Sequence, residues 1–571
     1  MPTPSVSITL AGSGGAGVMT AGSLLLEAAG RAGWYGRMTR SSGPQIRGGE
    51  AAAMLRFSTA PVEAQDDRCD LLLAIDWQNV GRFAAEIPLD ADALIIGDSD
   101  GGDPPDNITA MGAREARLPF KTLAKELPGG RPNMLALGVV AGLIGLPLAA
   151  LFAVVEKSLA RKGAEAVSAG RAAIQTGVEA ARELPAIPRL PAGHHDGAEH
   201  WLISGNQATG LGALRGGMRF VAAYPITPAT EILEWLAPAL ARVGGTLVQA
   251  EDELASVTQI IGASFGGTPA LTATSGPGLA LMMESIGLAV ASETPIVVVD
   301  VMRGGPSTGI PTKSEQTDLN IALYGLHGDA PHLVTAPTSV GDCAFTTQWS
   351  VRLAEALQTP AIVLSDQSLG QTQTLIPRPA DVAIGAERRV AAAPGESYHR
   401  YALTDDGISP MSLPGTPGGQ YTADGLAHNP HGTPSSSDVD HSAQLDKRQQ
   451  KLLQYDFGEH WAVQEGEGDV AVLTWGSSVG PVREALARLR EDGIPARLIA
   501  PRLLAPAQPE RLAEALHGVT RLLVVEQSHG RQFYRYLRAF YDLPRDTWVF
   551  ARPGPLPIRP GEIVARLRDW S

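Results

Sequence analysis

The amino-acid sequence predicts an α/β protein with three parallel-sheet domains. Short apolar runs of β type alternate with helical runs over most of the 571 residues, and this pattern favours parallel sheets with covered faces. Two segments interrupt the alternation, one rich in proline and one rich in proline, glycine and histidine. We therefore expect domains at residues 1–185, 201–385 and 467–571, joined by a linker at 186–200 and a long connecting segment at 386–466.

The first region begins with a predicted strand over residues 5–11, a glycine-rich loop, and a predicted helix over residues 18–32. Apolar residues fill the strand and recur at helical spacing after the loop. The same criteria predict strands at 51–57, 71–75 and 93–96 and helices at 135–145, 151–160 and 164–184. In the linker, prolines recur at every third position from Pro185 to Pro191, which ends the helical pattern.

The second and third regions repeat the alternation. The second predicts strands at 247–250, 270–274, 295–301 and 360–365, with helices such as 253–265 and 279–291 between them. The third predicts strands at 469–475, 496–499 and 521–526 and a helix at 481–491. Loops as long as the connecting segment are usually functional or disordered. Its aromatic and histidine content predicts an ordered segment that covers another surface.

Composition excludes several classes of function. The net charge of −14 argues against a general binder of nucleic acid or anionic membranes. No apolar run is long enough to span a membrane, and the N-terminus lacks the features of a secretory signal. Cys69 and Cys343 are too few for a disulfide framework or an iron–sulfur cluster. We expect a cytoplasmic protein that holds no metal by itself.

The glycine-rich loop, Gly12 to Gly17, fits the pattern G-x-G-x-x-G between a strand and a helix. A site for NAD would need an acidic residue after the second strand. Instead Arg37, Arg40 and Arg47 follow, with no acid before Glu50. Basic residues that face a helix N-terminus suit phosphate groups, so a cofactor such as coenzyme A is favoured over NAD. The simpler alternative is tight strand–helix packing beside solvated arginines.

Polar residues follow several predicted strands of the second region, where a parallel sheet opens its ligand crevice. Thr227 lies in the segment YPITPATE, held extended by the proline after it, although a plain helix start would also explain it. Arg303 precedes the loop GGPSTG, which is not a Walker motif because Ile310 stands where a lysine is required. Arg303 could grip a substrate carboxylate, or it could be a surface arginine.

Two further joints lie in the same region. Glu251, Asp252 and Glu253 open a predicted helix, where acidic residues stabilise the helix dipole. A buried member of this group could instead transfer protons, because neighbouring acids and burial raise a carboxyl pKa. Ser275 and Gly276 form another strand–turn–helix joint.

Taken together, these motifs resemble the α subunit of 2-oxoacid:ferredoxin oxidoreductases with a γ domain fused at its N-terminus, and most closely the 2-oxoglutarate branch. The resemblance covers essentially the whole chain. GSGGAGV and IRGGEA are similar to the γ domain. The remaining matches are YPITPAT, EDELAS, TSGPGLALMMESIGLA, RGGPSTGIPTKSEQTDL, RYALTDDGISPMSLPG, GLAHNPHG and DKRQQKL.

The resemblance implies oxidative decarboxylation of 2-oxoglutarate to succinyl-CoA and CO₂ on thiamine diphosphate, with electrons passing to ferredoxin. The middle region would be the domain that binds the thiamine pyrimidine, and the last region would be similar to a transketolase C-terminal domain. A separate β subunit would carry the diphosphate, Mg²⁺ and a [4Fe-4S] cluster, in a dimer of αβ heterodimers. The chain agrees, since it lacks four cysteines and a G-D-G…N diphosphate motif.

The resemblance also implies residue roles. Glu253, with Glu251 as the alternative, would bond the pyrimidine, Thr227 would contact the 2-oxoacid, and Arg303 would hold its carboxylate. Tyr224, Ser307, Thr308 and Lys313 would bind the substrate, Ser275 and Gly276 the thiamine, and Gly14, Gly15 and Arg47 coenzyme A. Two residues depart from the family pattern: Ala16 replaces glutamine and Ala229 replaces serine.

Three alternatives stay open at this point. The same chemistry could act on pyruvate or a branched-chain 2-oxoacid. The glycine loop could belong to an NAD-binding Rossmann protein, and a non-catalytic scaffold could keep the fold, although the presence of Thr227, Glu253 and Arg303 argues against that.

Overall fold

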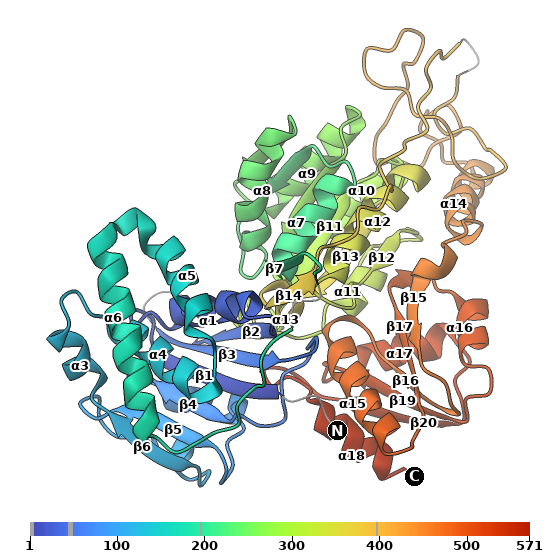
Figure 1. The fold of residues 1–571 in the computed structure, drawn as a ribbon. Coiled ribbons are helices and arrows are strands. Elements are labelled where there is room, and N and C mark those ends of the chain that lie inside the picture. The colour runs from blue at the N-terminus through green and yellow to red at the C-terminus, as the bar shows by residue number, and fades with distance from the viewer. Residues whose placement is uncertain (1–4, 44–48, 195–196, 396–397, 571) are drawn as a thin grey trace.

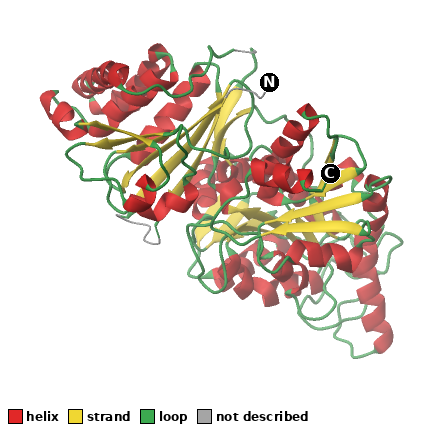
Figure 2. Cartoon of the chain, turned by 90° about the horizontal axis from the view of Figure 1, so that it is seen from below, coloured by secondary structure: helices red, strands yellow, loops and turns green. Residues whose placement is uncertain are grey.

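The computed structural model describes residues 5–43, 49–194, 197–395 and 398–570, which form three sheets flanked by helices (Figures 1 and 2). The sheets have eight, seven and five strands. This confirms the expected α/β class with three sheets. No helix in the described part of the chain combines the length and apolarity that crossing a bilayer requires.

The N-terminal sheet is mixed rather than parallel. Its central strand β1 (Ser5–Ser13) pairs antiparallel with β3 (Glu50–Ser58) and parallel with β4 (Leu71–Ala74). The helix α1 (Val18–Arg31) leads into β2 (Tyr35–Ser42), which pairs antiparallel with β3 and was not expected from the sequence. A dinucleotide fold would need a parallel strand directly after this helix. The topology therefore argues against the NAD-binding alternative.

Most of the other elements of the N-terminal region match the strands and helices predicted from the sequence. Strands β5 (Leu94–Asp98) and β6 (Arg114–Leu118) continue it in parallel, although β6 was not expected. The helices α4 (Pro132–Ile144), α5 (Leu148–Leu159) and α6 (Ala164–Ala180) lie over it. The glycine Gly138 in the apolar run of α4 has a packing role, because a Cβ there would lie 2.0 Å from the Ile174 carbonyl oxygen of α6.

The middle region begins and ends in the N-terminal sheet. Strands β7 (His200–Ser204) and β14 (Gln373–Pro377) pair with each other, and β14 also pairs with β2. The linker before β7 therefore does not separate two independent bodies.

The middle sheet has the order β18-β12-β13-β11-β10-β8-β9 and is parallel except at its β18 edge. Its strands are β8 (Phe220–Ala223), β9 (Thr246–Gln249), β10 (Ala270–Thr274), β11 (Val297–Met302), β12 (Leu333–Thr335), β13 (Ala361–Asp366) and β18 (Leu503–Ala505). The flanking helices include α7 (Gly205–Arg215), α8 (Thr230–Arg242), α9 (Glu253–Phe265), α10 (Gly276–Ala291) and α12 (Asp342–Leu357). Because the strands run in parallel, their carboxyl ends share one edge.

The C-terminal sheet contains β15 (Ala462–Glu465), β16 (Val470–Leu473), β17 (Arg497–Pro501), β19 (Arg521–Glu526) and β20 (Asp546–Ala551). Its helices include α15 (Val479–Glu491), α17 (Gln532–Phe540) and α18 (Pro560–Arg568). One apolar core joins this region to the middle sheet, since Trp475 and Phe533 belong to the same buried cluster as Val334. The β18 strand strengthens this connection, because it comes from the C-terminal region and pairs with β12.

The connecting segment projects from the upper right of the molecule in Figure 1 and includes the helix α14 (Asp438–Leu453). It is anchored on Glu293, which is fully buried after α10. Lys447 and Lys451 of α14 place their Nζ atoms 2.5 and 3.0 Å from the two carboxylate oxygens of Glu293. Burial alone would raise the Glu293 pKa, but Lys451, Lys447 and Arg400 hold it well below its usual range. The expected coverage of another surface thus rests on buried ion pairs.

Candidate active site

The predicted site residues gather at the carboxyl edge of the middle sheet. Thr227 follows β8, Glu253 follows β9, Ser275 follows β10 and Arg303 follows β11. These four strands are consecutive in the sheet order β11-β10-β8-β9. The parallel arrangement therefore brings together residues that are up to 76 positions apart in sequence.

Arg303 connects the two loops that the sequence singled out. Its guanidinium donates from Nη1 to the Thr227 carbonyl oxygen at 2.5 Å and from Nη2 to the Thr308 carbonyl oxygen at 2.9 Å. The side chain is 7% exposed, and its Nε has no hydrogen-bond partner among the described residues. Each Nη carries a second proton. Arg303 is thus a positioned fork rather than a surface arginine, and it keeps donors for a carboxylate.

Glu253 is the buried member of the acidic group at the start of α9. It is 8% exposed, whereas Glu251 lies at the surface and Asp252 caps the helix by accepting from the Ala255 amide at 2.7 Å. A Cβ on Gly278 would lie 2.7 Å from Glu253 Cγ, so the glycine lets the glutamate pack against α10. Within the described ranges the Glu253 carboxylate makes no hydrogen bond or ion pair. Asp252 therefore stabilises the start of α9, and the Glu253 carboxylate remains available for proton transfer.

A pair of carboxyl groups that sequence reasoning missed lies behind Arg303. Asp300 is fully buried inside β11, and neither of its oxygens meets a donor in the described part of the chain. Burial and the neighbouring Asp318 raise the Asp300 pKa well above its usual range, against the opposing effect of Arg303. Burial also raises the pKa of Asp318, to about 6. One proton shared by the pair removes the repulsion between them.

Asp318 connects this pair to the thiamine side of the predicted site. A Cβ on Gly276 would lie 2.7 Å from Asp318 Oδ2, so the carboxyl group lies against the start of α10. Ser275, directly before it, is fully buried, and its Oγ has no partner among the residues that the structure describes. Two predicted cofactor residues therefore lie beside an acid that the sequence analysis did not select. The single aspartate inside the apolar strand VVVDVM was the available signal for Asp300.

The other predicted substrate residues divide into two groups. Tyr224, Ser307 and Thr308 are exposed on the loops that Arg303 connects, and Ser307 adopts a left-handed backbone with φ of 60°. Lys313 instead reaches the N-terminal region, where its Nζ donates to Ser41 Oγ at 2.5 Å and to Glu86. Its ammonium group is thus held away from Arg303 by two partners.

The glycine loop has the expected strand–turn–helix form. Gly14 and Gly15 are exposed in the turn after β1, and α1 begins without a side-chain cap, which leaves amide donors at its N-terminus. The surrounding arginines differ from expectation. Arg40 pairs with Glu231 of the middle region, Arg37 lines a separate cavity, and Arg47 lies outside the described residues.

The comparisons with known proteins agree with this geometry. The family described as "Pyruvate flavodoxin/ferredoxin oxidoreductase, thiamine diP-bdg" matches residues 211–447. "Pyruvate ferredoxin/flavodoxin oxidoreductase" matches residues 7–180, and "Transketolase, C-terminal domain" matches residues 459–532. The chain is 37% identical over 375 residues to 2-oxoglutarate synthase subunit KorA of Methanothermobacter marburgensis, covering 65% of this chain and 98% of that one.

A second relative covers more of the chain. The 2-oxoacid:ferredoxin oxidoreductase 2, subunit alpha, of Aeropyrum pernix is 32% identical over 473 residues, which are 77% of this chain and 73% of that one. The chain belongs to the 2-oxoacid:ferredoxin oxidoreductase family. Its 2-oxoglutarate branch is confirmed by the structure of the 2-oxoglutarate:ferredoxin oxidoreductase from Magnetococcus marinus, with a TM-score of 0.90, 36% identity and 99% coverage of both chains.

These matches confirm the expected α-subunit assignment and the thiamine-binding and transketolase C-terminal-like regions. Members of this family are multi-subunit enzymes, as the relative's designation as subunit alpha indicates. The Magnetococcus protein was solved with 2-oxoglutarate, coenzyme A and succinyl-CoA bound.

Proposed function

We propose that this chain is the α subunit, with an N-terminal γ-type domain, of an enzyme that converts 2-oxoglutarate and coenzyme A to succinyl-CoA and CO₂ and passes electrons to ferredoxin. The observation that carries the proposal is the whole-chain likeness to the Magnetococcus 2-oxoglutarate enzyme. The position of Arg303 between the Thr227 and Thr308 loops supports it, because a 2-oxoacid needs a cation for its carboxylate.

The residues at the carboxyl edge suit the pyrimidine half of thiamine diphosphate. Glu253 is a buried acid whose carboxylate is free within the described chain, and Ser275 Oγ is a buried polar atom without a partner there. When bound, thiamine diphosphate supplies the nucleophile and the electron sink for decarboxylation. Glu253 would bond a ring nitrogen of the pyrimidine and exchange a proton with it, as a desolvated acid–base group can.

Arg303 and Thr227 would bind and orient the 2-oxoacid. The Arg303 guanidinium can bind a carboxylate without breaking its two contacts to the loops. The proton on Nε and the second proton on each Nη are still available to donate hydrogen bonds. The Thr227 hydroxyl makes no hydrogen bond within the described ranges, so it can donate to the oxo or carboxylate oxygen. Tyr224, Ser307 and Thr308 would contact the remainder of the substrate.

The rest of the active site would lie on a β subunit, in a dimer of αβ heterodimers. The diphosphate, Mg²⁺ and the [4Fe-4S] cluster belong to that proposed partner. Cys69 and Cys343 of this chain are both buried, and burial raises the pKa of the Cys69 thiol to about 11. Neither is suited to hold a cluster. We propose domain boundaries at residues 1–185, 201–385 and 467–571, with coenzyme A bound by the first domain. We also propose that the enzyme is cytoplasmic.

The test is to produce the chain with and without the product of a neighbouring reading frame that carries CxxC cysteines and a G-D-G motif. Reduction of a viologen dye is then followed with 2-oxoglutarate, pyruvate and a branched-chain 2-oxoacid. The proposal predicts coenzyme A-dependent activity, highest with 2-oxoglutarate, only when both subunits are present. Equal activity of the chain alone would refute the shared site, and preference for pyruvate would reassign the substrate.

A further inference from the structure

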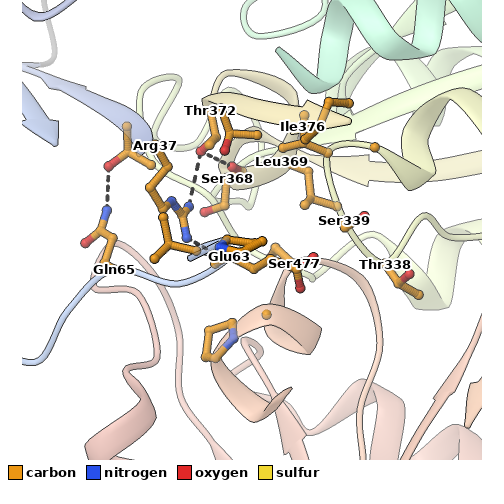
Figure 3. Close-up of a pocket in the computed structure, with 18 of the residues that line it drawn as sticks. Arg37, Glu63, Gln65, Thr338, Ser339, Ser368, Leu369, Thr372, Ile376 and Ser477 are labelled. Atoms are coloured by element: carbon orange, nitrogen blue, oxygen red, sulfur yellow. Dashed lines mark hydrogen bonds between the residues drawn. The ribbon is translucent and has the colours of Figure 1, made fainter. Parts of the chain in front are cut away.

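A cavity of about 340 Å³ lies where the three regions of the chain meet (Figure 3). Strand β2 and the segment that follows Pro61 form one wall, and the middle region contributes the segments after β12 and β13. The start of α15 closes the third side. In the order of the middle sheet, β12 and β13 lie on the opposite side of β11 from β8 and β9, which lead to Thr227 and Glu253. The cavity is therefore separate from the proposed 2-oxoacid site.

Arg37 brings a positive charge to this cavity that no carboxylate within the described chain neutralises. Its Nη1 donates to the Glu63 carbonyl oxygen and its Nη2 to Thr372 Oγ1 at 3.4 Å, and both acceptors are neutral (Figure 3). The Nε atom is buried and has no partner among the described residues. The Arg37 side chain lines the cavity.

The acids near Arg37 are already engaged. Glu484, which acts on Arg37 electrostatically, is held by both Arg56 terminal nitrogens at 2.6 and 2.9 Å and by Arg488 at 2.7 Å. The Glu63 carboxylate pairs with Arg483. Burial and the nearby Arg56 lower the Arg37 pKa to about 10, so Arg37 is charged at neutral pH. Buried charges in proteins are normally paired, and an unpaired guanidinium that faces a cavity calls for an anion.

The remaining walls are partly polar and partly apolar. Ser368 and Ser477 line the cavity. The Ser368 hydroxyl makes no hydrogen bond within the described ranges, whereas the Ser477 side chain donates to the buried Asp366 carboxylate. The amino end of α15 adds a favourable dipole for an anion. Leu369, Ile376 and Ile558 supply an apolar wall. An inorganic anion would leave these apolar side chains exposed to water, whereas a ligand with an apolar body would cover them.

We propose that this cavity is a second ligand site that binds an organic phosphate, with the phosphate on Arg37 and an apolar body against Leu369 and Ile376. A planar guanidinium with free protons, together with the Ser368 hydroxyl group, matches phosphate oxygens. Because the three regions all contribute walls, the ligand stabilises their junction. The site does not depend on the proposed catalytic function.

The test measures binding of phenyl phosphate, inorganic phosphate and benzyl alcohol to the full-length protein by calorimetry. Phenyl phosphate is expected to bind at least tenfold more tightly than either other probe. Arg37→Ala is expected to weaken phenyl phosphate binding at least tenfold, whereas Arg161→Ala, at an exposed arginine, leaves it unchanged. Because Arg37 also contacts Thr372, Ile376→Trp serves as a second variant that fills the cavity and keeps the guanidinium. It should abolish binding.

Several results would overturn the proposal. Equal affinity for phenyl phosphate and inorganic phosphate would remove the apolar half of the site. Unchanged binding in both Arg37→Ala and Ile376→Trp would place the ligand elsewhere. A rise in the KM for coenzyme A in these variants, matching the loss of phenyl phosphate binding, would assign the cavity to the catalytic coenzyme A site instead of a second ligand.

Discussion

Replacing Arg303 by lysine tests the proposed grip on the 2-oxoacid. Lysine keeps the charge but cannot present a fork, so it cannot bridge the Thr227 and Thr308 loops and bind a carboxylate through two nitrogens at once. A hydrogen bond to a charged group contributes about 1.5–3 kcal/mol. The loss of one such bond to the substrate corresponds to about a 10- to 150-fold decrease in kcat/KM for 2-oxoglutarate.

The assay is steady-state viologen reduction by the complete enzyme, with 2-oxoglutarate and coenzyme A varied in turn. The decrease is expected in kcat/KM for 2-oxoglutarate, with the KM for coenzyme A unchanged. Arg242→Lys, at an exposed position of α8, is the matched control and should behave as the native chain. A kcat/KM for 2-oxoglutarate within twofold of the native value, in a variant that remains folded, would refute the role of Arg303.

Two further predictions concern buried charge. Glu293→Gln leaves Lys447 and Lys451 buried without their counter-charge and should lower the free energy of unfolding by about 3–5 kcal/mol at pH 7, measured in urea. Burial lowers the Lys447 pKa to about 8. The loss of stability caused by Glu293→Gln should therefore shrink as the pH rises above 8 and Lys447 loses its proton. A loss below about 1 kcal/mol at pH 7 would contradict the account. Asp318, with its pKa raised to about 6, destabilises the fold progressively as it ionises between about pH 4 and pH 6. Asp318→Asn should therefore gain stability relative to the native chain over that range, and a constant difference between the two would be the contrary result.

The sequence was sufficient to predict the convergence at the carboxyl edge. Thr227, Glu253 and Arg303 each follow an apolar run, and a parallel sheet brings the ends of such runs together. The choice between Glu251 and Glu253 needed burial, which depends on the tight approach of Gly278 to α9. Sequence periodicity places both residues in the same helical turn and cannot separate them.

The expectations failed where long-range pairing decides the structure. The polar strand β2 lacks a clear alternation, and it forms because β3 and β14 supply partners on its two sides. In the same strand, Arg37 lines a cavity and Arg40 pairs with Glu231. The carboxyl pair of Asp300 and Asp318 is likewise a product of folding, because 18 positions separate residues that share one buried site.

The most direct test of the proposed shared active site is the turnover of Glu253→Gln in the complete enzyme. Glutamine keeps the size of the side chain but cannot exchange a proton, so 2-oxoglutarate-dependent viologen reduction should fall about 100- to 10,000-fold. The subunits should still assemble, since Glu253 packs against Gly278 of α10 and does not form a structural ion pair within the described chain. Turnover equal to that of the native enzyme would contradict the account and would move the proton-transfer role to Glu251 or away from this chain.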